Sequence, residues 1–339
     1  MSQPQDLLDS VSGQLRNLPL LATPETCSGR SYIVTGANSG LGFEAAKHLV
    51  SLGAAKVILA VRNISAGEKA KADIEASTGR TSSSEVWHLD LSSYESVNDF
   101  AKRATLKLDR IDALIENAGV AIDMSNQAEG HPATFTVNVF STFLLAMLLL
   151  PKMKADAQRL KIAPHITIVS SSVAFFTQPF WDLGKDDANP MNKIVQVGQL
   201  DMTSGYTVSK LLEVLAVRHI ASLIPVSSTG VVLNLVCPGL CKTDIGRNAT
   251  DDVKAVAGTM MDQIGRTSED GSRTLLFAAI AGKDSHGRFT ADCEIKDDSS
   301  VIPDWIKGGE AEEGRKRLWN VIANEIELAA PGSIAKVFS

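Results

Sequence analysis

The residues best suited to do chemistry lie in the segment YTVSK, where Tyr206 and Lys210 stand four positions apart. On a helix this spacing places the phenol and the ammonium on one face. An isolated tyrosine has a pKa of about 10 and is a poor base at neutral pH, and a nearby cation lowers that pKa by favouring the phenolate. Such a pair can exchange a proton with a substrate oxygen. The same spacing also arises by chance in exposed helical pairs, so other parts of the chain must support it.

A glycine-rich turn is the second functional feature. A β-branched run begins at Ser31, and Gly36, Gly40 and Gly42 follow it, just ahead of a helical pattern. The first amides of a helix have no intrahelical partner, and the helix dipole makes that end electropositive. Glycines keep these amides open to a pyrophosphate, so the turn predicts a phosphate site. A tight strand-to-helix connection is the alternative interpretation.

The end of the second predicted strand indicates which dinucleotide such a turn would bind. About 20 residues beyond the turn, an acidic residue commonly holds the ribose 2′-hydroxyl of NAD. This chain has Val61 and Arg62 there. A guanidinium can hold a 2′-phosphate through paired charge-assisted hydrogen bonds, whereas an acid would repel it. We therefore expect NADP(H) rather than NAD(H), unless Arg62 is only a solvated residue at a strand end.

Strand and helix patterns that alternate along the chain must position these residues. Strands are expected at 31–36, 56–62, 84–91, 111–119, 165–172, 230–239 and weakly at 287–292, and helices at 40–52, 65–77, 93–107, 133–157, 204–223 and 309–328. Apolar strands separated by helix-length segments predict an α/β fold with a doubly wound parallel sheet, a Rossmann fold. The expected organisation is an N-terminal arm at 1–28, one domain at 29–300 with a substrate loop at 173–203 and a lid at 244–270, and a C-terminal helical extension at 301–339.

Composition narrows the function classes. The chain has 339 residues, 44% hydrophobic content and a net charge of −6, without the Lys/Arg patch that nucleic-acid binding needs. No leader pattern is visible at the N-terminus, and the apolar run 139–150 is too short for a membrane span and predicts a buried helix. Four cysteines form no disulfide framework, and neither they nor the six histidines show metal-ligand spacing. We expect a cytoplasmic protein without a metal.

Further motifs follow in order behind the glycine turn, and together they resemble the short-chain dehydrogenase/reductase family from about residue 30 to 295. The spacing T-G-x-x-x-G-x-G, LDL at 89–91, ENAG at 116–119, YTVSK, and CPGLCKT at 237–243 carry this resemblance. It implies a catalytic set of Asn138, Ser171, Tyr206 and Lys210. It also implies cofactor contacts from Gly36, Asn38, Ser39, Gly40, Leu41, Gly42, Arg62, Asp90, Leu91, Asn117, Ala118, Gly119, Tyr206, Lys210, Pro238, Gly239 and Thr243.

The resemblance implies a role for each catalytic residue. The Ser171 hydroxyl would hold the substrate oxygen, with Ser170 and Ser172 as alternatives in the SSS segment. Lys210 would hydrogen-bond the nicotinamide ribose as well as tune the tyrosine. Asn138 would hold a water that relays protons to Lys210; alternatively it is a mid-helix asparagine that bonds a neighbouring carbonyl.

On the cofactor side, Asp90 would face the adenine amino group, Pro238 and Gly239 would shape a loop, and Thr243 would reach the carboxamide. Glu116 departs from the family's N-N-A-G, which puts the local hydrogen bonding of that turn in doubt.

The substrate side differs from the small members of the family. Ser171 and Tyr206 are 35 positions apart, and the insertion carries Phe175, Phe176, Phe180 and Trp181. These rings suggest a bulky apolar or aromatic substrate, or they only pin a long loop to the body. The overall pattern is most similar to the branch with retinol dehydrogenases, protochlorophyllide reductase and the WW-domain oxidoreductase, and to fungal natural-product tailoring reductases.

The resulting hypothesis is an NADPH-dependent reductase, or the reverse alcohol dehydrogenase, that interconverts a medium-sized hydrophobic ketone or aldehyde and its alcohol. Tyr206 would be the general acid in reduction. An NADP-binding regulatory or scaffold protein, and a non-redox cyclase or epimerase with structural NADP, are the alternatives. The helices at 139–150 and 206–223 could form a family-type dimer interface, or the chain is a monomer.

Overall fold

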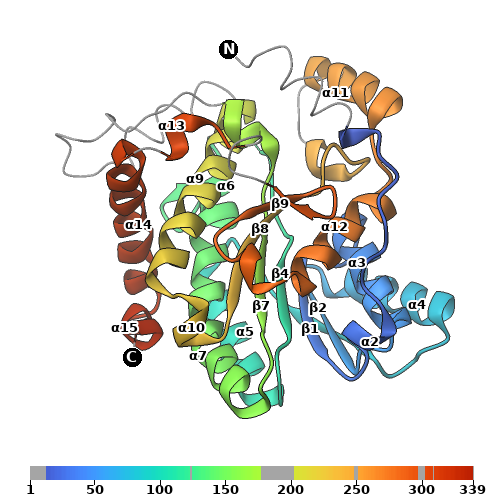
Figure 1. The fold of residues 1–339 in the computed structure, drawn as a ribbon. Helices are drawn as coiled ribbons and strands as arrows, with labels where there is room; N and C mark the ends of the chain where they lie inside the picture. Colours follow the sequence, from blue (N-terminus) through green and yellow to red (C-terminus); the bar gives the residue numbers. More distant parts are fainter. Residues whose placement is uncertain are drawn as a thin grey trace.

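A central sheet, sandwiched between two layers of helices, organises the computed structural model (Figure 1). The structure describes residues 13–122, 124–176, 202–247, 251–296, 302–307 and 309–338. Helices α3, α4 and α12 cover one face of the sheet, and α5, α7 and α9 cover the other. The prediction of a doubly wound α/β fold is confirmed.

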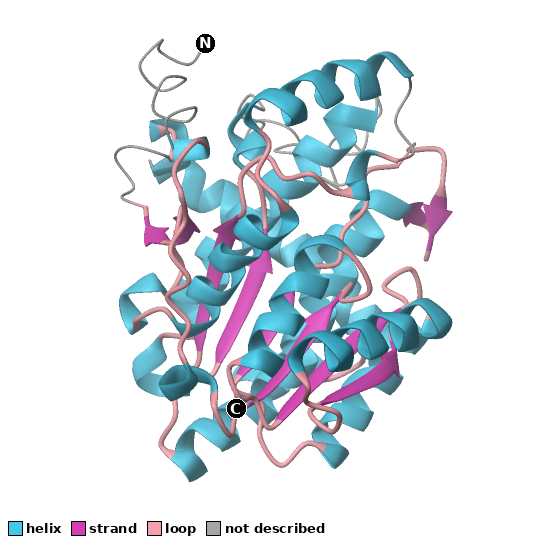
Figure 2. Ribbon diagram, turned by 90° about the vertical axis from the view of Figure 1, so that its right-hand side faces the viewer, coloured by secondary structure: helices cyan, strands magenta, loops and turns pink. Residues whose placement is uncertain are grey.

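The eight-stranded sheet has the order β10-β9-β8-β7-β4-β1-β2-β3. All neighbouring pairs are parallel except β9 and β10 (Figure 2). The strands are β1 Ser31–Thr35, β2 Lys56–Val61, β3 Ser84–His88, β4 Ala113–Glu116, β7 His165–Val169, β8 Val232–Cys237, β9 Phe289–Ala291 and β10 Glu294–Ile295, with a separate β5 Gln127–Ala128 and β6 His131–Pro132 pair. The chain reverses its winding direction between β1 and β4, and in such sheets ligands bind at the carboxyl ends of the strands at this switch point.

The helices follow the strands closely. They are α2 Pro24–Cys27, α3 Gly40–Ser51, α4 Ile64–Thr78, α5 Tyr94–Lys107, α6 Ala133–Phe135, η1 Thr136–Ser141, α7 Thr142–Leu160, η2 Ser172–Phe176, α9 Met202–Leu223, α10 Val226–Thr229, η3 Asp244–Gly246, α11 Asp251–Ile264, α12 Ser268–Ile280, η4 Lys283–Ser285, α13 Asp304–Lys307, α14 Gly309–Ala329 and α15 Ser333–Phe338. Local chemistry sets some of the boundaries: Asn63 caps the start of α4 by accepting a bond from the Ala66 amide, and Gly79 ends that helix in the left-handed region.

The helix expected at 133–157 is continuous through α6, η1 and α7, but it contains a π-helical segment around Asn138. Extra residues of this kind inside a helix often mark functional sites. The span Ala133–Leu160 is long and apolar enough to cross a membrane, yet 89% of its most apolar stretch is buried within the fold. This burial fits the core helix that the sequence predicted.

The C-terminal helices pack against the two helices that could form a family-type dimer interface. Helix α14 packs against both α9 and α7, and α15 packs against α7 (Figure 1). Trp319 of α14 meets Phe143 of α7 edge to face, with ring centroids 6.4 Å apart. The C-terminal extension thus occupies surface on α7 and α9 that a second copy of the chain would need.

Several predicted boundaries were too generous. The strand expected at 111–119 ends at Glu116, and the one at 230–239 ends before Pro238, which has no amide to donate to a ladder. The lid expected at 244–270 runs into α12, which is a core helix with Leu275 and Leu276 fully buried. Most of the substrate loop lies outside the described residues.

Candidate active site

The glycine turn after β1 brings bare backbone to the switch point. Gly36 and Gly40 have φ angles of +65° and +58°, in the left-handed region that favours glycine. A Cβ on Gly42 would lie 2.5 Å from the Asn117 Nδ2 and 2.6 Å from the Gly36 carbonyl oxygen. Each glycine is therefore required, for the turn itself or for its packing against the end of β4.

Helix α3 starts directly at this turn, at Gly40. Asn38 and Ser39 are exposed, and Ser39 makes no side-chain cap to the helix amides. Leu41 is half-buried and points to the start of α12, since a Cβ on Gly271 would lie 2.7 Å from its Cδ2. The amino end of α3 thus combines an open backbone, exposed polar side chains and a positive dipole, which suits an anion.

Arg62 lies beside the turn because β1 and β2 are paired in register. Thr35 is opposite Ala60, and the Gly36 amide donates to the Ala60 carbonyl at 2.8 Å. Arg62, two residues further on, is exposed. The sheet therefore holds a guanidinium next to the glycine turn, where the sequence placed it.

Asp90 follows the adjacent strand β3, one more step along the sheet. Its Oδ1 accepts bonds from the Ser92 amide at 2.9 Å and the Ser92 hydroxyl at 2.6 Å. Asp90 is half-buried, whereas Leu91 is buried in the core. The structure therefore puts the Leu91 side chain into packing, which leaves its backbone as the part that could reach a ligand.

The ENAG segment keeps its turn despite the departure at Glu116. Asn117 Nδ2 donates to the Thr35 carbonyl at 2.8 Å, and the Ala118 amide donates to the Thr35 hydroxyl at 2.9 Å. These bonds tie the end of β4 to the end of β1. The hydrogen bonds of the turn are thus present although Glu116 replaces an asparagine, and the Glu116 side chain itself is buried.

Asn138 and Lys210 converge over Gly119. A Cβ on Gly119 would lie 3.3 Å from Asn138 Oδ1 and 3.8 Å from Lys210 Nζ. Asn138 Oδ1 accepts from the Val120 amide at 2.9 Å, and its Nδ2 donates to the Val120 carbonyl and the Ser209 hydroxyl, each at 2.9 Å. Asn138 therefore hydrogen-bonds residues outside its own helix. This differs from the alternative of a mid-helix asparagine that bonds a neighbouring carbonyl of its helix.

The three serines after β7 have different surroundings. The buried Ser170 hydroxyl donates to the Lys210 carbonyl at 3.2 Å. Ser171 is half-buried, and its Oγ accepts a long 3.4 Å bond from the Val173 amide. Ser172 begins η2, which packs against α9. Compared with Ser170, Ser171 thus has the weaker hydrogen bond and the more available hydroxyl.

Tyr206 and Lys210 lie on the same face of α9, as predicted. The Lys210 Nζ is 5.6 Å from the centroid of the Tyr206 ring. The ammonium donates to the Val169 carbonyl at 2.9 Å and forms an ion pair with Glu213 at 2.7 Å. Lys210 is 4% exposed and Glu213 1%. A carboxylate absent from the predicted site is therefore the lysine's direct partner.

The pKa of Tyr206 moves opposite to the sequence-based expectation. Burial raises the pKa of the Tyr206 phenol, and the charges of Glu213 and Cys237 act in the same direction. We expected a pKa lowered by Lys210, but burial is the largest effect and raises it, and the negative charge of Glu213 adds to that shift.

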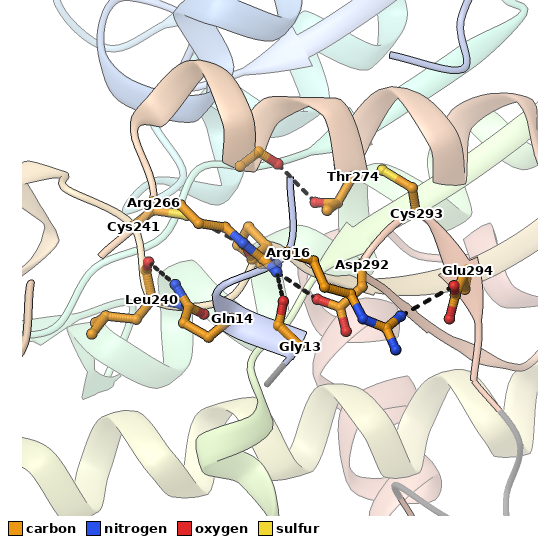
Figure 3. A network of polar contacts seen from close by, with 12 residues as sticks. Gly13, Gln14, Arg16, Leu240, Cys241, Arg266, Thr274, Asp292, Cys293 and Glu294 are labelled. Atoms are coloured by element: carbon orange, nitrogen blue, oxygen red, sulfur yellow. Dashed lines mark hydrogen bonds and ion pairs between the residues drawn. The ribbon is translucent and has the colours of Figure 1, made fainter. Parts of the chain in front are cut away.

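The loop after β8 is clamped by the N-terminal arm (Figure 3). Gln14 donates to the Leu240 and Ile264 carbonyls at 2.7 and 2.9 Å and accepts from the Leu240 amide at 2.9 Å. The buried Arg266 donates to the Pro238 and Gly13 carbonyls at 2.9 and 2.6 Å, and pairs with Asp292 at 2.7 Å. The arm is thus a structural part of this loop.

This clamp fixes the predicted loop residues. Gly239 has a φ of +80°, and a Cβ there would lie 2.5 Å from the Gln14 Oε1. Thr243, four residues on, reaches the glycine turn, because its Cγ2 lies 3.5 Å from where a Gly40 Cβ would be. The β8 loop and the β1 turn therefore meet across the edge of the sheet.

The described part of the aromatic insertion divides its rings between packing and exposure. Phe175 packs on Phe289, with ring centroids 5.2 Å apart, which fits the pinning alternative for this ring. Phe176 is 69% exposed. Phe180 and Trp181 lie outside the described residues.

The residues fit a bound dinucleotide. Side chains on the turn glycines would crowd the turn, so its backbone stays bare. The amino end of α3 beside it is open, and the exposed Arg62 follows β2. Within the described ranges, no group of three or more His, Cys, Asp and Glu side chains could hold a metal. The sequence analysis did not identify Glu213, Gln14 or Arg266. Of these, only Glu213 could have been predicted, because helical spacing places it on the same face as Tyr206 and Lys210.

Residues 30–182 match the short chain dehydrogenase family. The chain is 42% identical over 310 residues to the short chain dehydrogenase/reductase dmxR8 of Cryptosporiopsis sp. (strain 8999), covering 90% of this chain and 93% of that one. It is 34% identical to the short-chain dehydrogenase/reductase ffsI of Aspergillus flavipes, covering 91% and 90%.

Among solved structures, the fold is similar to a short chain dehydrogenase from Shigella flexneri complexed with NADP. The TM-score is 0.59 at 22% identity, over 80% of this chain and 100% of that one. This chain has the glycine turn and the Tyr-Lys pair on α9, and it is similar to such relatives along nine-tenths of its length. The chain therefore belongs to the short-chain dehydrogenase/reductase family.

Proposed function

We propose that this oxidoreductase uses NADPH to reduce the carbonyl group of a medium-sized hydrophobic or aromatic ketone or aldehyde. The observation that carries the proposal is the convergence of Asn138 and Lys210 over Gly119, next to the glycine turn and on the same helix face as Tyr206. When bound, the reduced nicotinamide supplies the hydride that adds to the carbonyl carbon.

The open edge of the sheet would hold the dinucleotide. Its pyrophosphate would lie at the amino end of α3, where the Gly36 to Gly42 turn leaves the amides bare. Arg62 would contact the 2′-phosphate, and Asp90 the adenine. Thr243, held near Gly40 by the clamped β8 loop, would orient the carboxamide.

The proton would come from Tyr206. The Ser171 hydroxyl would hold the substrate oxygen, and the Tyr206 phenol would donate its proton to that oxygen as negative charge develops. Lys210 would stabilise the resulting phenolate. Asn138, fixed by three hydrogen bonds to Val120 and Ser209, would keep the proton path toward Lys210 in place.

The substrate class rests on the insertion. Phe176 is an exposed aromatic ring at its start. Relatives such as dmxR8 and ffsI come from fungi, which supports a role in tailoring a natural product in secondary metabolism. A place near the retinol dehydrogenase branch stays a prediction from the sequence. The covering of α7 and α9 by α14 and α15 favours the monomer over the family-type dimer.

The test is turnover with the full chain. We expect NADPH to be oxidised in the presence of members of a panel of aromatic and polycyclic ketones, with one alcohol formed for each NADPH lost. Product formation without NADPH loss would favour the cyclase or epimerase alternative. No turnover with any carbonyl, despite tight NADPH binding, would favour the regulatory alternative.

A further inference from the structure

Two buried carboxyl groups lie behind the Tyr206 and Lys210 pair. Glu213 is on α9, three residues after Lys210, and Glu116 ends β4. They are 1% and 2% exposed. One oxygen of Glu213 pairs with Lys210, and the hydroxyls of Ser170 and Thr35 lower the pKa values of Glu213 and Glu116, although neither hydroxyl meets full hydrogen-bond geometry with them. Buried carboxyl groups with so few good partners are costly, so a structural role alone explains them poorly.

The ion pair with Glu213 changes what Lys210 can do. The 2.7 Å contact places a carboxylate closer to the ammonium than the Tyr206 ring, whose centroid is 5.6 Å away. Both partners are shielded from water, so their charges interact strongly. The pair presents little net positive charge to the phenol, and the usual means of stabilising a phenolate is weakened.

Within the described ranges, the other groups around the phenol add no cation. Among the described residues, the titratable groups that face this cluster are Glu116 from β4 and Cys237 at the end of β8, together with Lys210 itself. Glu116 and Glu213 repel each other when both are charged, and burial raises the pKa of Glu116 well above its usual range. Burial likewise raises the pKa of Glu213 to about 7, although Lys210 opposes this shift.

We propose that Glu213 is a positioning residue that holds the Lys210 ammonium in place and, by offsetting its charge, extends to higher pH the range in which Tyr206 stays protonated and can donate its proton. This inference rests on the function proposed above. In reduction, hydride adds to the carbonyl carbon, the C=O π pair moves to oxygen, and that oxygen takes the proton of the Tyr206 O–H bond. The phenolate left on Tyr206 must then take up a proton again, so the pH range of the activity depends on the pH at which this phenol ionises.

The chain allows a test that does not depend on any substrate. It contains three tyrosines, and burial raises the pKa of all three. The near-ultraviolet absorbance of tyrosinate, followed during a pH titration of the folded full chain, therefore reports on Tyr206 as the difference between a protein with this tyrosine and one without it. A Tyr206→Phe variant identifies its share of the signal.

Glu213→Gln should move the Tyr206 midpoint down by about one pH unit or more, because it removes a negative charge and frees the ammonium. Glu213→Met, which replaces the carboxylate by an apolar chain, should do the same and serves if the glutamine variant does not fold. In turnover, the reductase activity of either variant should decline at lower pH than that of the wild type.

The matched control is Asp156→Asn on α7. Asp156 is also 1% exposed and ion-paired, with Lys152 at 2.5 Å, but it lies away from Tyr206. It should leave the midpoint unchanged. An unmoved midpoint in both Glu213 variants, or an equal shift in Asp156→Asn, would overturn the inference. Failure of the wild type to reduce any carbonyl would sink the proposed function and leave the titration result standing.

Discussion

The two halves of the carboxyl edge of the sheet are built on opposite principles. Beside β1, β2 and β3, the groups proposed to bind the cofactor are open: bare amides, Asn38, Ser39 and Arg62. Beside β4, β7 and α9, the charged groups are Lys210 and Glu213, almost fully buried. The first half can bind a ligand through what it leaves uncovered. The second half changes the proton affinities of its side chains by burying them, because charges interact more strongly in the interior than in water.

Tyr206→Phe tests the buried half most severely. It removes the proton donor and keeps the ring, so the rate of carbonyl reduction should fall by about 10²- to 10⁴-fold. The binding of NADPH, measured by fluorescence titration, should change little. A variant with nearly full activity would mean that another group supplies the proton.

Arg62→Ala tests the open half. Loss of charge-assisted hydrogen bonds to the 2′-phosphate should weaken NADPH binding by about 10- to 100-fold and leave NADH binding nearly unchanged. Arg80→Ala is the matched control, because Arg80 is also exposed but reaches Ala54, at the opposite end of β2. Equal losses for the two nucleotides, or in both variants, would refute the assignment of Arg62.

Gln14→Ala tests the clamp that joins the two halves. It leaves the backbone groups of Leu240 and the Ile264 carbonyl without their partner, which should cost about 1–3 kcal/mol of unfolding free energy and raise the KM for NADPH. Arg16→Ala, which breaks an ion pair between two exposed side chains on the same arm, should cost far less. Both are measured by denaturant unfolding and initial rates, and similar effects of the two would contradict a specific clamp.

The smallest effect concerns stability against pH. The Glu116 pKa lies well above its ordinary value of 4.5 in the folded chain. Between those two pKa values the folded state binds the extra proton, so the unfolding free energy falls as pH rises, by at most about 1.4 kcal/mol per pH unit. Glu116→Gln should flatten this decline in thermal melts. Glu85→Gln, where a Lys56 bond lowers the carboxyl pKa, should not flatten it.

The sequence was sufficient for the sheet and for the open half. Strands such as 56–61 are short β-branched runs between turn residues, and the glycine turn and Arg62 are local features whose meaning depends only on their place after a strand. Boundaries failed where tertiary contacts decide. Helix α12 begins with a polar turn that resembles a loop, and only its packing against α3 identifies it as core.

The buried half could be read only in part. The helical spacing gave Tyr206 and Lys210, and the same spacing includes Glu213, but burial and the 2.7 Å ion pair that give Glu213 its effect depend on β4 and β7. The arm contacts of Gln14 join residues more than 200 positions apart, which no local pattern encodes. Predictions for Phe180 and Trp181 remain predictions.

The most direct measurement of the central claim is the fate of the transferred hydrogen. NADPH carrying deuterium at the reactive C4 position is incubated with the protein and an aromatic ketone that it consumes, and the alcohol is examined by mass spectrometry and NMR. The account predicts that wild-type protein forms an alcohol with deuterium on the carbinol carbon, and that Tyr206→Phe forms almost none of this alcohol. An alcohol without the label, or equal labelling by the two proteins at equal rates, would contradict it.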